Sequence, residues 1–314
     1  IKQTSMADLS TSKKVKMPQP LRHGDTIAIC SPAGPISKDK VNGAADVLRN
    51  YGWKVRIMPH TLGQYGNYSG KDSERYDDLA TALTDPEVRA VICSRGGYGV
   101  VHLLDSLDKL DLATDPKWVV GFSDISALHA LMVRHGIASI HGSMTDAIRR
   151  GANDKDNARL FDLLQGRRDP VAFATDPRHD RPGIASGTLY GGNLAVLADL
   201  LDTRFDLLRR DSILFIEDVS EPIYKIERIM YQLRISGILP SLRGLMVGQF
   251  TEYHPDASYQ DMNDMIADMV APYSFPVAFN VPIGHVQHNV PVIEGAQVTL
   301  KVTTGDTSNL IYWS

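Results

Sequence analysis

The chain has 314 residues, 43% of them hydrophobic and 22% charged, which is typical of a soluble globular protein and long enough for two domains. A net charge of −4 without an extended basic run argues against a nucleic-acid partner, because phosphate binding needs a concentrated basic face. No stretch approaches the ~20 apolar residues of a membrane span, and the polar N-terminus lacks the apolar core of a signal peptide. We therefore expect a cytoplasmic protein with no membrane partner.

The N-terminal segment and the two cysteines each give a further expectation. Residues 1–20 are polar and begin with Ile1 rather than Met, so we expect a disordered or tag-derived tail outside the fold. The two cysteines, Cys30 and Cys93, each lie in a short apolar run. This pattern predicts buried thiols in a reducing compartment rather than a disulfide framework.

Residues 21–165 alternate between strand-like and helix-like segments. The expected strands are 26–31, 54–58, 88–93 and 118–122, and the expected helices are 38–51, 72–83, 100–107 and 125–134. Strands that are apolar on both faces and alternate with helices are typical of a parallel sheet covered on both sides. The sequence therefore predicts an N-terminal α/β domain with a Rossmann-like or flavodoxin-like parallel sheet.

The pattern changes after residue 165. Residues 166–186 are rich in Arg, Asp and Pro, which predicts an exposed linker. In residues 187–314 the expected helices are 194–201, 223–236 and 262–270, and the expected strands are 212–216, 244–249, 277–281, 290–293, 297–302 and 310–313. Many β-branched residues and turns near the end predict a smaller, β-rich second domain.

A serine follows the strand expected at 118–122, in the run Gly121-Phe122-Ser123-Asp124, and a helix begins at once. Such a turn lies at the carboxyl end of a parallel sheet, where α/β proteins bind ligands. Ser123 is therefore a candidate nucleophile, and the Asp124 amide a candidate oxyanion donor. The match to the Gly-x-Ser-x-Gly turn is partial, and capping of the helix by Ser123 or Asp124 is the alternative.

A glycine-rich turn, Arg95-Gly-Gly-Tyr-Gly99, follows the strand expected at 88–93. Paired glycines let backbone amides approach a ligand closely, so this turn is a candidate phosphate cradle or second oxyanion donor. It is not a P-loop, because no Gly-Lys-Ser/Thr follows. A plain tight turn is the alternative interpretation.

Two further segments supply a carboxylate and an imidazole. Glu217 follows the apolar run 214–216 and can orient a histidine, while His285 follows a Pro- and Gly-rich turn and is a candidate general base. His288 completes half of a metal-binding pattern, but no Cys, His or Glu cluster supplies the other half. A surface histidine is the alternative. The order Ser123, Glu217, His285 supplies nucleophile, orienter and base.

Six separated motifs occur together in one order. They are Arg95-Gly-Gly-Tyr-Gly99, Gly121-x-Ser-Asp124, His141-Gly142, Gly191-Gly-Asn193, Phe215-Ile-Glu-Asp218 and Gly284-His285. In these motifs the chain resembles the LD-carboxypeptidases, a family of serine peptidases, from about Leu21 to the C-terminus. One departure is Ser143, which stands where the family often has proline.

The resemblance implies an N-terminal α/β domain and a β-rich, swivelling-type C-terminal domain. It implies a triad of Ser123, Glu217 and His285, with backbone amides of Asp124 and Gly97 as oxyanion donors. It also implies a homodimer that uses no cofactor and no metal. Members of the family release the terminal D-alanine from murein tetrapeptides during cytoplasmic peptidoglycan recycling.

Substrate contacts and competing functions stay open at this point. Arg95, Gly96 and Asn193 are candidate substrate-binding residues, with Arg95 suited to a free carboxylate. A related branch hydrolyses microcin-type peptide–nucleotide conjugates and tends to have an extended loop. No insertion stands out between Glu217 and His285, which favours the cell-wall enzyme. A phosphate-binding α/β protein and a non-catalytic peptide-binding module are the remaining alternatives.

Overall fold

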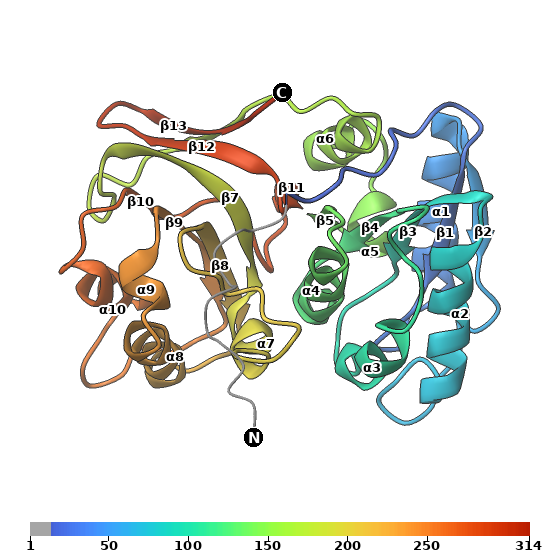
Figure 1. Ribbon diagram of the computed structural model, residues 1–314, viewed down its shortest axis with the longest axis horizontal. Coiled ribbons are helices and arrows are strands. Elements are labelled where there is room, and N and C mark those ends of the chain that lie inside the picture. Colours follow the sequence, from blue (N-terminus) through green and yellow to red (C-terminus); the bar gives the residue numbers. More distant parts are fainter. Residues whose placement is uncertain (1–13) are drawn as a thin grey trace, which may run out of the picture.

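The structure is a computed structural model and describes residues 14–314. It consists of two halves that lie side by side, each built on one sheet (Figure 1). The first sheet has six strands in the order β11-β5-β4-β3-β1-β2. Its strands are β1 Thr26–Cys30, β2 Lys54–Ile57, β3 Val88–Cys93, β4 Trp118–Gly121, β5 Ser139–His141 and β11 Val292–Glu294.

Helices cover both faces of this first sheet. They are α1 Lys38–Tyr51, α2 Asp72–Thr84, α3 Leu104–Leu107, α4 Ser126–Arg134, α5 Thr145–Ile148 and α6 Lys155–Leu164, with 3₁₀ turns η1 Val100–Leu103 and η2 Ser123–Ile125. Side chains of β1 alternate between the faces: Ile27 and Ile29 pack with α1 and α6, and Ala28 and Cys30 pack with α2 to α4. Strands β1 to β5 pair in parallel. Their spatial order, 2-1-3-4-5, is that of a flavodoxin-like sheet, which confirms the predicted α/β fold.

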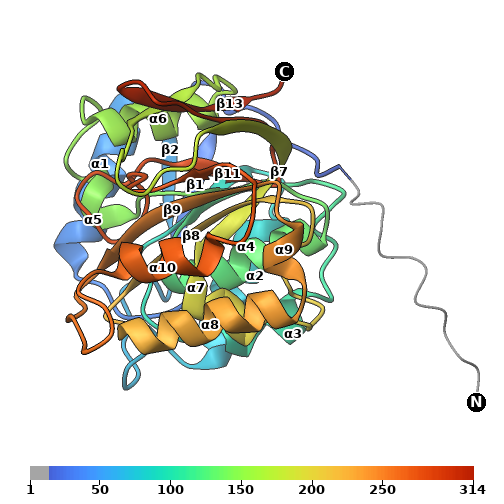
Figure 2. The ribbon, with the colours of Figure 1, turned by 90° about the vertical axis from the view of Figure 1, so that its left-hand side faces the viewer.

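The second sheet has seven strands in the order β10-β9-β8-β7-β12-β13-β6. Its strands are β6 Val171–Ala174, β7 Gly183–Asn193, β8 Ile213–Val219, β9 Gly244–Thr251, β10 Val277–Ala278, β12 Gln297–Val302 and β13 Thr307–Tyr312. Strands β7 to β10 run parallel, whereas β12, β13 and β6 are antiparallel. Its helices are α7 Leu194–Asp199, α8 Ile223–Ile235, α9 Ile238–Ser241 and α10 Met262–Val270. Figure 2 shows α8 and α10 against this sheet.

Two segments expected to lie outside the folded domains take part in them. The predicted linker 166–186 contains β6, which pairs with β13, and the beginning of β7, which pairs with β12. Of the predicted tail, residues 1–13 lie outside the described part, but the Lys16 amide donates to Gly136 O at 2.7 Å. In both places the backbone pairs with a distant strand or loop, and this pairing orders a segment whose polar composition predicts no regular structure.

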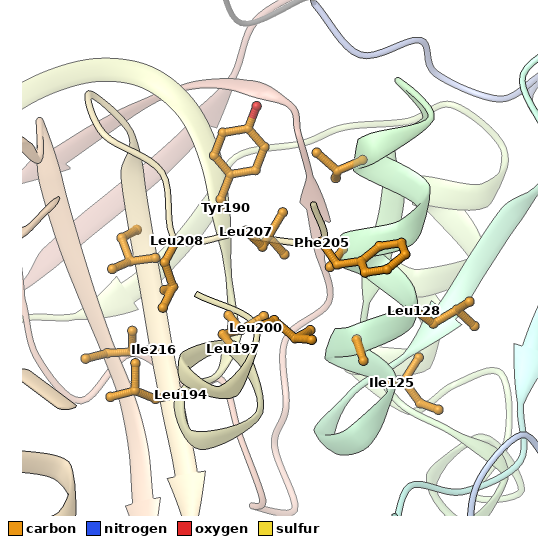
Figure 3. Close-up of a cluster of buried hydrophobic side chains, with 14 of the residues drawn as sticks. Ile125, Leu128, Tyr190, Leu194, Leu197, Leu200, Phe205, Leu207, Leu208 and Ile216 are labelled. Atoms are coloured by element: carbon orange, nitrogen blue, oxygen red, sulfur yellow. The ribbon is translucent and has the colours of Figure 1, made fainter. Parts of the chain in front are cut away.

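The two halves share strands and core. Strand β11, from the C-terminal part of the chain, pairs antiparallel with β5 and completes the first sheet. The buried side chains of Leu128 on α4 and Leu197 on α7 belong to one apolar cluster, which spans the contact between these two helices and continues to Ile216 on β8 (Figure 3). Burial of this apolar surface holds the halves together, at about 25 cal/mol per Å² removed from water.

Both cysteines are free and buried, as predicted. Burial raises the pKa of the Cys93 thiol above its ordinary value, so the thiol is inert. Among residues 14–314 no helix combines the length and the hydropathy needed to cross a bilayer.

Candidate active site

Ser123 lies directly after β4, where the chain turns from strand to helix. It is the first residue of η2, and its φ of 64° lies in the left-handed region that non-glycine residues rarely adopt. Such a conformation costs about 1 kcal/mol or more, and it persists only where the surrounding structure enforces it. The turn presents the hydroxyl at the carboxyl end of the parallel sheet.

His285 reaches Ser123 from the other half of the molecule. Its Nε2 lies 3.0 Å from the Ser123 Oγ, although 162 residues separate the two. The loop turns at Gly284, where φ is 138° and an added Cβ would lie 3.1 Å from the Glu217 Cβ. A glycine is therefore required for this loop to approach β8 so closely.

Glu217 is fully buried within β8, and its Oε2 lies 2.8 Å from the His285 Nδ1. The strand expected to end at residue 216 continues to Val219, so Glu217 is inside the strand rather than beyond its end. The register between β8 and β9 shifts between Ile216 and Asp218. Such an irregularity re-aims a side chain, here toward the histidine.

The carboxylate controls both the tautomer and the charge of His285. With Nδ1–H donating to Glu217, the Nε2 of the neutral ring is free to accept from the Ser123 hydroxyl. Burial lowers the pKa of His285, but the hydrogen bond and the negative charge of Glu217 outweigh burial and raise the pKa above its ordinary value. The arrangement favours an imidazolium once a proton has been taken up.

The glycine-rich turn packs directly against Ser123. An added Cβ on Gly96 would lie 2.9 Å from the Ser123 Cβ and 3.1 Å from its Oγ. The Gly96 carbonyl accepts from the Gly34 amide at 3.0 Å, so the Gly97 N–H, across a trans peptide, points the opposite way. Among the residues that the structure describes, neither Gly97 N–H nor Asp124 N–H donates to a protein acceptor.

The carboxylate of Asp124 joins this turn to the helix that begins at Ser123. It is buried and accepts from the Val100 amide at 3.0 Å, which caps η1. Burial raises the pKa of Asp124, and the hydrogen bonds from the amides of Val100 and Gly99 oppose the rise. The turn and the serine are thus held in one position relative to each other.

Asn193 lies at the end of β7, beneath the site. Its Oδ1 accepts from the Val196 amide at 3.1 Å, and its Nδ2 donates to Asp218 Oδ1 at 3.0 Å. Asp218 also accepts from the Ala195 amide at 2.8 Å, and burial raises the pKa of Asp218 to about 6. Asn193 thus caps α7 through Oδ1 and holds Asp218 through Nδ2, and its contact with substrate stays a prediction.

A cleft of about 830 Å³ opens beside Phe122 and His285. Residues of both halves line it, among them Arg95, Ser143 and Gln287. The Arg95 Nη1 donates to Pro35 O at 2.8 Å. No carboxylate within residues 14–314 forms an ion pair with this guanidinium, which leaves most of its donors available to a ligand.

The loop that carries His285 is tied to the first half by two contacts that sequence reasoning missed. Nδ1 of His288 lies 2.8 Å from Asp156 Oδ2, and the Arg150 Nη1 donates to Gln287 O at 3.0 Å. Partners separated by more than 130 residues leave no local signal in the sequence. Within the described chain, no group of three His, Cys, Asp or Glu side chains is arranged to hold a metal ion.

Hydroxyl, imidazole and buried carboxylate stand in sequence at hydrogen-bond distance, with two free amides beside the hydroxyl. This is the constellation that acyl transfer through a serine nucleophile requires. Ser123 is half-buried, and its neighbours Phe122 and His285 line a cleft large enough for a peptide segment.

Comparison with known proteins points to one family. The sequence profile of the LD-carboxypeptidase N-terminal domain matches residues 27–142, and that of the LD-carboxypeptidase C-terminal domain matches residues 186–300. The murein tetrapeptide carboxypeptidase of Pseudomonas aeruginosa is 31% identical over 84% of this chain and 89% of its own. The "probable murein peptide carboxypeptidase" of Bacillus subtilis is 31% identical over 90% of this chain and 91% of its own.

Solved structures agree in fold. The muramoyltetrapeptide carboxypeptidase from Oxalobacter formigenes superposes with a TM-score of 0.83 at 29% identity, covering 92% of this chain and 99% of its own. The microcin C7 self-immunity protein MccF has the same TM-score of 0.83 at 18% identity, covering 95% of this chain and 98% of its own. At that identity the second match shows the fold alone.

Proposed function

Because the chain belongs to the LD-carboxypeptidase family and is a serine-type hydrolase, we propose that Ser123, Glu217 and His285 are its catalytic triad. The observation that carries this proposal is the pair of distances at His285, 3.0 Å to Ser123 Oγ and 2.8 Å to Glu217 Oε2. The substrate that the relatives' names support is a murein tetrapeptide, from which the terminal D-alanine is released.

In the first step, Ser123 Oγ attacks the carbonyl carbon before the D-residue while His285 Nε2 takes the hydroxyl proton. His285 then donates that proton to the nitrogen of the departing D-residue, and an acyl-enzyme remains. Water attacks the ester with His285 again as base, which frees the shortened peptide and restores Ser123. Glu217 holds the imidazole ring and stabilises its positive charge throughout.

The oxyanion of each tetrahedral intermediate would accept from the Asp124 and Gly97 amides. Their position beside Ser123 and their lack of a described protein acceptor support this assignment. Loss of one such donor typically costs about 100- to 1000-fold in kcat. Gly96 would let the peptide approach Ser123 closely, because glycine has no side chain to fill the space beside the Ser123 hydroxyl.

Arg95 would bind the terminal carboxylate that a carboxypeptidase must recognise. It lines the cleft next to the glycine-rich turn, and it has no carboxylate partner among the described residues. A guanidinium can pair with a carboxylate through two parallel hydrogen bonds, which fixes the end of the peptide as well as its charge. Because the bound carboxylate is that of the terminal residue, cleavage at Ser123 would release one residue.

We also propose that the protein acts as a homodimer in the cytoplasm, as the family resemblance implies, without a nucleic-acid partner at a net charge of −4. Light scattering on the purified protein tests the dimer. The microcin-type function is the weaker candidate, since MccF matches at only 18% identity, whereas murein carboxypeptidases match at 31%.

The decisive experiment compares wild type with Ser123→Ala on the tetrapeptide L-Ala-γ-D-Glu-meso-diaminopimelate-D-Ala. Mass spectrometry should detect D-alanine with the wild type and none above background with the variant. A microcin-type conjugate in the same panel should stay intact. Release of D-alanine by Ser123→Ala at the wild-type rate would show that another residue is the nucleophile.

A further inference from the structure

Two cations other than Arg95, Lys40 and Arg149, line the cleft that opens beside His285. Lys40 on α1 and Arg149 directly after α5 both face the cleft, and both bind the same carboxylate, Asp146. Lys40 Nζ lies 3.5 Å from Asp146 Oδ2, and Arg149 Nη2 lies 2.9 Å from Asp146 Oδ1. Two positive groups therefore share one negative group.

The cleft as a whole carries an excess of positive charge. Its lining includes four cations, Lys40, Arg95, Arg149 and Arg150, and among the described lining residues Asp146 is the one carboxylate. The Asp146 side chain is 58% exposed, so water screens its hold on Lys40 and Arg149. Arg150 is engaged elsewhere, with Asp154 at 3.3 Å and Gln287 O at 3.0 Å. Lys40 and Arg149 are thus the cations free to exchange partners.

We propose that Lys40 and Arg149 form a second anion subsite, which binds a free carboxylate on the acyl side of the bond that is cleaved. The inference builds on the proposed function. Arg95, next to the glycine-rich turn, accounts for the carboxylate of the departing residue, and the cleft volume of about 830 Å³ leaves room for several more residues. Lys40 and Arg149 stand on other elements and meet a different part of the peptide.

A peptide with a γ-linked glutamate shows which two substrates this subsite would distinguish, the free acid and its amide. When a glutamate is joined through its γ-carboxyl, its α-carboxylate stays free and negative. Amidation of that group keeps its size nearly unchanged but removes the charge. Two cations that share one exposed carboxylate gain a charge-assisted hydrogen bond from the acid and not from the amide. The enzyme should therefore select acidic peptides over their amidated counterparts.

The test uses two tetrapeptides that differ only in whether the D-glutamate α-carboxyl is free or amidated. We expect wild type to favour the free acid about tenfold in kcat/KM, which corresponds to one charge-assisted hydrogen bond. Lys40→Gln and Arg149→Gln should each raise KM for the acid about tenfold and leave the amidated peptide unaffected. Lys301→Gln, an exposed cation on β12, is the matched control and should change neither value.

Several outcomes overturn the inference. It fails if wild type does not discriminate between the peptides, or if both variants slow the two peptides by the same factor. It also fails if the variants weaken only a peptidyl nucleotide, since the subsite would then bind phosphate. If wild type releases D-alanine from neither peptide, the proposed function is at fault, and calorimetric binding of the two peptides decides the subsite independently.

Discussion

His288 and Asp156 form an ion-pair geometry that bridges the two halves of the molecule, with 2.8 Å between Nδ1 and Oδ2. Asp156 lies in the first turn of α6 and its side chain is 5% exposed, whereas His288 follows His285 by three residues. Burial of one partner shields the contact from water and makes it stronger than a surface pair. The pair holds the loop of His285 against the half that carries Ser123.

We predict that His288→Gln or Asp156→Asn lowers kcat about 3- to 10-fold with little change in KM, because a loosened His285 spends less time aligned with Ser123. The rate of labelling by a fluorophosphonate should fall in parallel, as it also depends on the activated hydroxyl. His254→Gln alters an exposed histidine and serves as the control. Unchanged labelling together with a lower Tm would assign the pair to stability alone.

The raised pKa of His285 sets the acid limit of activity. Since only the neutral imidazole can take the Ser123 proton, kcat/KM should be level at high pH and fall as the pH drops through a pKa above 6.5. Glu217→Gln removes the charge that raises this pKa, so the fall of kcat/KM at low pH, the acid limb of the profile, should move to lower pH. The plateau should fall by about 10⁴-fold, as in other triads that lose their carboxylate.

A pH–rate profile of wild type and Glu217→Gln measures both effects. Glu252→Gln is a matched control, because Glu252 also raises the pKa of His285 but only through its charge. It should shift the limb slightly and keep the plateau. An acid limb that stays in place in Glu217→Gln would contradict the assignment of the limb to His285.

Gly96→Ala should lower kcat about 100-fold while the protein stays folded. The added Cβ would lie 2.9 Å from the Ser123 Cβ, closer than real Cβ contacts occur, so the serine or the turn must move. A displacement of about 1 Å at a nucleophile can cost about 100-fold. Gly305→Ala, whose Cβ meets only Thr303 Oγ1 at 3.7 Å, provides the control. Equal kcat in the two variants would exclude a tight contact at Gly96.

The left-handed conformation of Ser123 predicts that, of two variants that both lack the hydroxyl, Ser123→Gly is more stable than Ser123→Ala. At a φ of 64°, Ser123→Gly relieves strain that Ser123→Ala retains. The glycine variant should therefore unfold with a free energy about 1 kcal/mol higher than the alanine variant, measured in urea. If the alanine variant is equally stable, the turn carries no strain.

Two buried histidines should make the fold sensitive to acid. Burial lowers the pKa of His129 to about 4, and burial lowers the pKa of His141 well below its ordinary value of 6.5. Between pH 6.5 and about 4 the unfolded chain binds these protons and the folded chain does not, so the free energy of unfolding falls as pH falls. His129 alone accounts for about 3 kcal/mol of loss at the end of that range.

Urea unfolding at pH 7.5, 6 and 4.5 checks this dependence. His129→Gln, which keeps a polar side chain near Ser139 Oγ and Gly121 O, should be less stable at pH 7.5 but less dependent on pH. A pH dependence identical to that of wild type would mean that other groups, such as carboxylates, dominate the acid response.

Local sequence patterns predicted much of the fold. The bounds of α1, β3, α10 and β12 agree with the expected ranges, because apolar spacing and the residues that flank it define each element. Strand β7 was the main omission. Its glycine and serine residues have low strand propensity, and pairing with β8 and β12 on either side stabilises it instead.

The sequence likewise identified the residues of the candidate site but not the features that align them. Ser123, Glu217 and His285 were identifiable because each ends or follows an apolar segment, and the structure brings the three side chains together. Their alignment depends on features with no local signal. The shifted register at Glu217 and the contact of His288 with Asp156 arise only when residues far apart in the chain have come together.

The pairing of β11 with β5 also bears on how the protein is made. Residues 292–294 are synthesised about 150 residues after β5, so β5 stays an open strand edge until then. Open edges of this kind recruit other chains, and nascent proteins are exposed to that hazard. A transcript cut short before Val292 would thus yield a fragment prone to aggregation, and expressing the N-terminal half alone would carry the same risk.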